Sequence, residues 1–179
     1  MTTFPHRVMA ASVLDVDTYE EVEADRSATW QAFLVVLASS LAGGIGASGF
    51  FSDGRLILQG VFVWSGIVLV AWAAWALLVF EIGGRLFPEP ETSVDVGELL
   101  RTIGFASAPG MLRVLGVVPA LTLPVFALST VWMLVAMVVA VRQALDYRST
   151  WRAIGVCALG MALALGIAVA FGLLAAPLS

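Results

Sequence analysis

Few side chains in this chain could do chemistry in apolar surroundings. The only histidine is His6, the only cysteine is Cys157, and all nine cationic side chains are arginines. A serine–histidine protease needs a histidine beside its nucleophile, and a serine–lysine dyad needs a lysine, so both classes are excluded for want of residues. One histidine and one cysteine also make a metal site implausible, and a lone cysteine excludes an intrachain disulfide. We therefore predict no catalytic, cofactor-binding or metal-ligating residue, and we expect the protein not to be an enzyme.

Arg113 is the candidate for chemistry within an apolar stretch, where Pro109 and Gly110 precede it. Proline removes an amide donor and clashes with the preceding turn, so we expect a kink or a broken helix there. An intramembrane cation is by default a functional candidate. The alternative is structural: Arg113 is only about six residues from the end of its stretch, so it could snorkel to the interface or bind a carbonyl freed by the kink.

Glu81 and Arg85 form the other charged pair at the edge of an apolar stretch. Their spacing of four residues suits an ion pair on the surface of one helix. We favour this structural interpretation over a proton relay.

The elements that must hold these residues are apolar stretches of about 20 to 25 residues, the length that crosses a bilayer core of about 30 Å as a helix. Hydrophobic residues make up 60% of the chain and charged residues only 12%. We predict an all-α, polytopic integral membrane protein. It has a short acidic cytoplasmic segment, 1–27, and a transmembrane domain, 28–179, with five spans at about 28–49, 56–80, 99–118, 119–141 and 151–171.

The arginines predict the orientation of these spans. Seven of them fall on one side of the predicted membrane, against Arg55 alone in the loop between the first two spans: Arg7, Arg26, Arg85, Arg101, Arg142, Arg148 and Arg152. The positive-inside rule then places the N-terminus in the cytoplasm and the C-terminus outside. The exclusive use of arginine suggests a GC-rich bacterial genome, so we expect the protein in the cell (inner) membrane.

The N-terminal segment carries most of the acidity of the chain, which has a net charge of -4. It offers no basic patch, so we predict no nucleic-acid partner. A short interfacial helix could include Phe4, Val8, Met9, Val13 and Leu14, and no signal cleavage site follows this segment. Thr18 and Glu21 have the spacing of a capping box at a helix start.

Small residues predict where helices approach one another, because close backbone contact drives association in lipid. Gly43, Gly46 and Gly49 give the first span a smooth end. In the last span Ala158, Ala162, Gly166 and Ala170 recur every four residues. We interpret both patterns as packing within the chain rather than as an oligomer interface.

Two segments resemble a known family. The run from Asp95 through Arg101, Gly104 and Phe105 to Pro109 is similar to the stretch that opens the third span in prokaryotic members of the Yip family, the Ypt/Rab-interacting membrane proteins. The acidic run 15–25 resembles the approach to the first span in the same proteins. The resemblance covers nearly the whole chain and implies a five-span, non-enzymatic membrane scaffold or adaptor.

The resemblance has limits. The chain has a short acidic segment in place of a long cytosolic domain and lacks the Asp-Leu-Tyr-Gly-Pro signature of eukaryotic members. Binding of Rab-type GTPases is therefore not carried over. The partners we expect are the lipid bilayer, and other membrane proteins or further copies of this chain.

Two functions from different classes follow. The first is a scaffold whose cytoplasmic surface comprises the N-terminal segment, the loop from Pro88 to Glu91 and the loop from Arg142 to Arg152. The arginines of that last loop could instead sit against anionic headgroups, or merely set topology. The second is a small permease or channel with a path beside Pro109 and Arg113, with Glu81 also involved.

Overall fold

The computed structural model describes residues 2–50 and 58–175, and this part of the chain contains helices and no strand. In chain order the elements are α1 (Phe4–Ser12), α2 (Val16–Ala24), α3 (Ala28–Gly46), η1 (Ala47–Phe50), α4 (Leu58–Val79), η2 (Phe80–Leu86), α5 (Val96–Phe105), η3 (Ala108–Val117), α6 (Pro119–Ala144) and α7 (Thr150–Ala175). The prediction of an all-α fold is confirmed for these residues.

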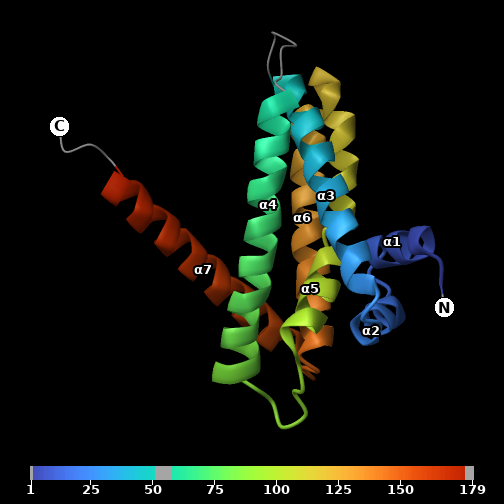
Figure 1. Ribbon diagram of the computed structural model, residues 1–179, viewed down its shortest axis with the longest axis vertical. Coiled ribbons are helices and arrows are strands. Elements are labelled where there is room, and N and C mark those ends of the chain that lie inside the picture. The colour runs from blue at the N-terminus through green and yellow to red at the C-terminus, as the bar shows by residue number, and fades with distance from the viewer. Residues whose placement is uncertain (1, 51–57, 176–179) are drawn as a thin grey trace.

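Three helices are long and apolar enough to cross a membrane: α3, α4 together with η2, and α6. The described part of α7 up to Gly166 is a shorter apolar helix. Figure 1 shows α3, α4 and α6 running side by side as a bundle, while α7 leaves the bundle obliquely. The chain is thus built as a membrane protein, with helices that satisfy their own backbone hydrogen bonds.

The third predicted span consists of two different helices. The α-helix α5 ends at Phe105, and after a short turn the chain continues as the 3₁₀ helix η3 from Ala108. Pro109 explains the end of α5, because its ring would clash with the carbonyl of Phe105 four residues earlier. The predicted break is present, and it begins a few residues before Pro109 and Gly110.

Glycines let both α5 and η3 lie against α3 at very short distance. A Cβ atom added to Gly46 would lie 1.7 Å from the backbone oxygen of Arg113, and one added to Gly110 would lie 2.1 Å from the Ser39 hydroxyl. At Gly104 an added Cβ would meet the Ala32 methyl at 2.7 Å. Only glycine fits these positions, so the predicted smooth end of the first span is confirmed at Gly46. Gly49 lies outside the residues whose side-chain surroundings are described.

The N-terminal segment folds into the helices α1 and α2, which lie on one side of the bundle (Figure 1). Helix α2 packs against α5 and α6, and α1 packs against α2, η3 and α5. The predicted capping box at Thr18 is wrong. Helix α2 starts earlier, with Asp15 as its N-cap, and the Asp15 carboxylate accepts hydrogen bonds from the amide and the hydroxyl of Thr18 at 3.2 and 2.6 Å. Glu21 is therefore free to pair elsewhere. The expected helix in the apolar segment is present as α1, where Met9 is 72% exposed, but it ends at Ser12, before Val13 and Leu14.

The row of small residues on α7 does not pack within the chain as predicted. Ala158 and Ala162 are exposed, and an added Cβ on Gly166 would meet nothing within 4 Å. Ala153, Val156 and Gly160 face the bundle instead. The surroundings of the Ala170 side chain lie outside the described residues. The oblique path of α7 explains the difference, because its first turns alone contact the bundle closely.

Candidate functional site

Two loops that are distant in sequence meet at one end of the bundle. The Arg148 guanidinium pairs with the carboxylate of Glu91, 57 residues away, and Arg152 Nε lies 3.2 Å from Glu89 Oε1. The Glu89 carboxylate also accepts a hydrogen bond from the Arg148 amide at 3.2 Å. We call the surface made by residues 87–92 and 142–152 the loop face. It unites two of the three segments that the sequence analysis assigns to a partner-binding surface.

The ion pair between Arg148 and Glu91 on the loop face is exposed, whereas Glu89, the partner of Arg152, is only 10% exposed. Arg148 and Glu91 are 77% and 55% exposed, and an ion pair in water contributes little to stability because solvent screens it. Uncharged bonds fix the loops more firmly: the Thr92 hydroxyl donates to the Leu145 carbonyl at 2.8 Å and accepts from the Glu89 amide at 3.0 Å. The exposed charges are thus displayed from a fixed backbone.

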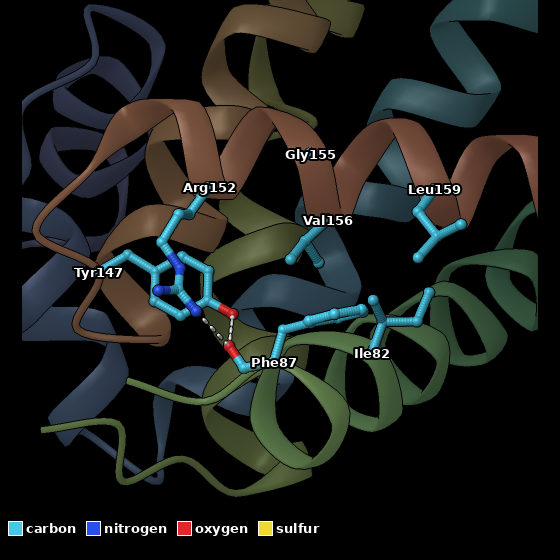
Figure 2. Close-up of a pocket in the computed structure, with 7 residues that line it drawn as sticks. All are labelled: Ile82, Phe87, Tyr147, Arg152, Gly155, Val156 and Leu159. Carbon is cyan, nitrogen blue, oxygen red and sulfur yellow. Dashed lines mark hydrogen bonds between the residues drawn. The ribbon is translucent and has the colours of Figure 1, made fainter. Parts of the chain in front are cut away.

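Tyr147 anchors the loop face to the membrane helices. Its buried hydroxyl lies 2.8 Å from the carbonyl oxygen of Phe87 and 3.0 Å from that of Gly83, so it donates between the two. Figure 2 shows Tyr147 and Arg152 converging on the Phe87 carbonyl, to which Arg152 Nη2 also donates at 3.2 Å. Burial raises the pKa of Tyr147 above its ordinary value, so the hydroxyl remains a donor at neutral pH.

A cavity of about 340 Å³ opens beside Tyr147 and is lined mainly by apolar side chains of η2 and α7, including Ile82, Val156 and Leu159 (Figure 2). Arg152 stands at its polar edge, 5.4 Å above the Tyr147 ring. Because Arg152 already bonds to Glu89 and to a carbonyl, the cavity presents no uncompensated charge.

Arg142 is exposed at the end of α6, where its Nε donates to the Tyr147 carbonyl at 3.2 Å. This bond satisfies a carbonyl of the turn that follows the helix. Each of the three arginines of the predicted surface therefore has a partner within the chain.

Glu81 and Arg85 form the predicted pair, with Arg85 Nη1 2.8 Å from Glu81 Oε1. Both side chains are more than half exposed, and the Arg85 guanidinium also lies 5.0 Å from the centre of the Phe80 ring. The pair sits on η2, at the lower end of the bundle in Figure 1. This geometry is that of a surface ion pair.

Arg113 is bound to hydroxyl groups in the middle of α6. Its Nε donates to Ser129 Oγ at 3.1 Å and its Nη2 donates to Thr130 Oγ1 at 2.9 Å, while the guanidinium lies 5.4 Å from the centre of the Phe126 ring. The described hydrogen-bond partners of Arg113 are thus hydroxyls of α6 and not a carbonyl freed by the kink, while snorkelling to the interface stays a prediction. Glu81 belongs to the opposite level of the bundle, so the structure does not bring these two candidates together.

Pro109 and Gly110 are buried between α3 and α6, where Gly110 faces Ser39 and Met133. Their position is that of packing residues which allow η3 to approach α3. Neither offers a polar side chain to a ligand.

A buried arginine that the sequence analysis treats only as a topology signal organises the N-terminal segment. Arg7 is 2% exposed, and its guanidinium lies 2.9 Å from carboxylate oxygens of both Glu21 and Asp25 and 3.0 Å from the amide oxygen of Gln31. Hydrogen bonds from Thr2 and then from Arg7 lower the pKa of Glu21 to about 2. Bonds from Ser27 and Arg7 lower the pKa of Asp25. This cluster ties α1 and α2 to the start of α3.

Arg101 is the second arginine of this kind. It is buried on α5, and its Nε donates at 3.0 Å to the carbonyls of Val22 and Glu23 at the end of α2. Burial, together with the neighbouring carboxylates of Asp146 and Glu98, raises the pKa of Glu23 to about 7. The spacing of the acidic residues in 15–25 did not predict the bonds of Arg101 to the end of α2 or the burial of Glu23, because both depend on the docking of α2 against α5.

Within residues 2–50 and 58–166, no group of three or more histidine, cysteine or acidic side chains is placed to hold a metal ion. Comparison with known families gives one result. A profile described as the Yip1 domain matches residues 12–171. No curated protein and no solved structure matches the chain.

Proposed function

The chain belongs to the Yip1 domain family, and we propose on this premise that it is a non-enzymatic membrane scaffold or adaptor that binds partner proteins through the loop face. The observation that carries the proposal is the junction of the two loops. Exposed charges of both signs, with Arg148 and Glu91 foremost, are held on a backbone fixed by Thr92 and Tyr147. A surface that is ordered before binding loses little conformational entropy when a partner docks.

The proposed topology has five crossings, with the loop face in the cytoplasm of a bacterial cell and the C-terminus outside. The two parts of the third span support this count. At about 1.5 Å per residue for an α-helix and 2.0 Å for a 3₁₀ helix, α5 and η3 together extend about 35 Å, enough for a core of about 30 Å. The α6–α7 turn, η2 and the start of α5 lie in the lower part of the bundle in Figure 1, where α2 packs against α5 and α6. The arginines of these elements therefore share one side, which the positive-inside rule makes cytoplasmic.

In-membrane crosslinking tests the scaffold proposal. A photo-crosslinking amino acid at Glu91, which is exposed on the loop face, should capture a defined protein, and the same residue at Val131, which is exposed on the lipid-facing side of α6, should not. Capture at Glu91 should be lost in the variant Arg142→Gln/Arg148→Gln/Arg152→Gln. The matched control is Arg85→Gln, which removes an exposed cation from the same end of the bundle without touching the loop face.

The two competing interpretations of the arginines give different results. If the arginines only bind anionic headgroups, the triple variant changes capture at Glu91 no more than Arg85→Gln does. If they only set topology, the triple variant inverts part of the protein, which cysteine accessibility at the loops reveals. Equal capture from Glu91 and Val131 would contradict the scaffold proposal.

A permease or channel is the second candidate, favoured by the position of Arg113 at the wall of two cavities. One lies mainly between α3 and α4, and the other lies between α4, α6 and α7. In reconstituted vesicles Arg113→Leu should then abolish flux at unchanged protein abundance. Absence of flux with the parent protein, or equal flux with the variant, excludes this function.

A further inference from the structure

A cavity of about 510 Å³ lies between α4, α6 and α7. Its volume falls within the range of about 300–1,000 Å³ in which small-molecule sites are found. Most of its lining consists of long apolar side chains, those of Met133, Leu134, Met137, Ile154 and Met161. Such a lining suits a hydrocarbon chain, because flexible methionine side chains can adapt to the irregular shape of the ligand.

One wall of this cavity carries a cation. Arg113 lines it together with Thr130, the hydroxyl that accepts from Arg113 Nη2. The described partners of the guanidinium are the hydroxyls of Ser129 and Thr130 and the ring of Phe126, all of which are uncharged. The sequence contains no Asp or Glu from residue 99 to 145 or after Asp146. The helices that surround Arg113 therefore cannot supply a carboxylate, and an ionised group in apolar surroundings is costly unless it is paired.

An aromatic side chain lines the same cavity. The indole of Trp75 forms part of the wall, although its Nε1 is itself buried and does not open into the cavity. The cavity thus combines a guanidinium with an apolar and aromatic lining and no carboxylate.

We propose that this cavity binds a long-chain carboxylate, a fatty acid, whose head group pairs with Arg113 and whose hydrocarbon chain lies along the methionine-rich wall. A carboxylate matches the guanidinium in charge and in its two acceptor oxygens. The proposal concerns this cavity alone and is independent of the loop face.

The depth of Arg113 favours a carboxylic acid over other anions. Thr130 lies 11 residues after Pro119, the start of α6, which corresponds to about 16 Å along the helix. An inorganic anion would have to cross this depth with its charge unshielded. A carboxylic acid can move through hydrocarbon in its neutral form, because desolvation raises its pKa, and it ionises beside a cation, which lowers the pKa again.

Quenching of tryptophan fluorescence tests the proposal directly, because Trp75 is part of the wall. The probe is 9,10-dibromostearate, whose bromines quench indoles on contact, titrated into the full-length protein in a non-ionic detergent. Its neutral methyl ester is the control for simple partitioning into the micelle. We expect saturable quenching by the acid, a loss of most of its amplitude in Trp75→Phe, and only unsaturable quenching by the ester.

Variants test separately whether binding requires the charge of Arg113 and whether it requires the open cavity. Arg113→Gln should weaken apparent affinity by about tenfold or more, the effect expected for one charge-assisted bond. Arg85→Gln should leave it unchanged, because Arg85 is an exposed cation that does not line the cavity. Arg113→Lys should retain part of the affinity. If Arg113→Gln does not fold, Ala158→Phe fills the cavity from an exposed position on α7 and should abolish saturable quenching while the protein stays folded.

Three results would overturn the proposal. They are equal quenching by the acid and its methyl ester, equal affinity of Arg113→Gln and Arg85→Gln, and saturable quenching that survives Ala158→Phe. Tighter binding of dodecyl phosphate than of the acid in a competition would also reject a carboxylate as the ligand.

Discussion

The contact between Gly46 and the backbone of Arg113 makes the sharpest prediction about the fold. In Gly46→Ala the new Cβ would lie 1.7 Å from the Arg113 carbonyl oxygen and 2.7 Å from its carbonyl carbon. Contacts under 3.0 Å are essentially never seen for real Cβ atoms, so α3 and η3 would have to separate by more than about 1 Å. The obstacle is backbone, which cannot swing aside as a flexible side chain would.

The expected loss of stability follows from this geometry. Overpacking a well-packed site costs about 1–3 kcal/mol, and a backbone obstacle places Gly46→Ala at the upper end, about 3 kcal/mol or more. For a chain of this size about 1 kcal/mol corresponds to about 2–4 °C, so the apparent Tm should fall by about 6–12 °C. The control is Gly66→Ala, where an added Cβ meets nothing within 4 Å and the better helix propensity of alanine should leave the Tm unchanged or slightly raised.

The assay is thermal unfolding of both variants in one detergent at one scan rate, followed by tryptophan fluorescence. Equal scan rates are needed because the unfolding of membrane proteins is often irreversible. If Gly46→Ala unfolds within about 2 °C of the parent protein, the close approach of η3 to α3 is refuted.

Three further predictions concern the charged end of the bundle. Arg7→Gln leaves the carboxylates of Glu21 and Asp25 without their buried cation. Because breaking a buried ion pair costs about 3–5 kcal/mol, the apparent Tm should fall by at least about 6 °C. The control is Arg26→Gln, which removes an exposed cation and should change the Tm little. The raised pKa of Glu23 means that the folded state binds its proton more tightly than the unfolded state, so stability should fall as pH rises from 4.5 to about 7 and then level off. Tm measured at intervals from pH 5 to 8 checks this, and an unaltered slope in Glu23→Gln would contradict it. Arg148→Gln should shift the Tm by less than about 2 °C, because exposed ion pairs contribute little, and a larger loss would show that the loop face depends on them.

Local sequence signals predicted the helices of the bundle well. Apolar stretches of spanning length identified α3, α4 and α6, and the proline at 109 identified the break in the third span. The pair Glu81 and Arg85 followed from helix periodicity alone. Each of these features depends on residues within a few turns of one another, which is the range over which composition and spacing act.

Contacts between distant segments were not predictable in this way. Arg7 and Arg101 look like ordinary topology signals beside predicted spans, yet both are buried in the packing of α1 and α2 against α3 and α5. A local signal for one boundary was present: Asp95 and Glu98 form a reciprocal capping box that starts α5, three residues before the predicted start of the third span. The 3₁₀ conformation of η3 had no such signal, because it follows from its close packing on α3.

The arginines of the chain differ in what they bond to, and this difference separates the two proposals. At the charged end Arg7, Arg148 and Arg152 meet carboxylates, and Arg101 meets backbone carbonyls. Arg113 alone of these five is bonded to hydroxyls only, in a part of the sequence without acids. Since hydroxyls compensate a full positive charge less well than carboxylates, Arg113 gains most from an anion that the protein does not itself provide. The charges of the loop face are already paired, so they suit a partner surface of complementary charge more than a single anion. We therefore expect substitutions at Arg113 to weaken fatty-acid binding, and different substitutions, those of the loop face, to abolish partner capture.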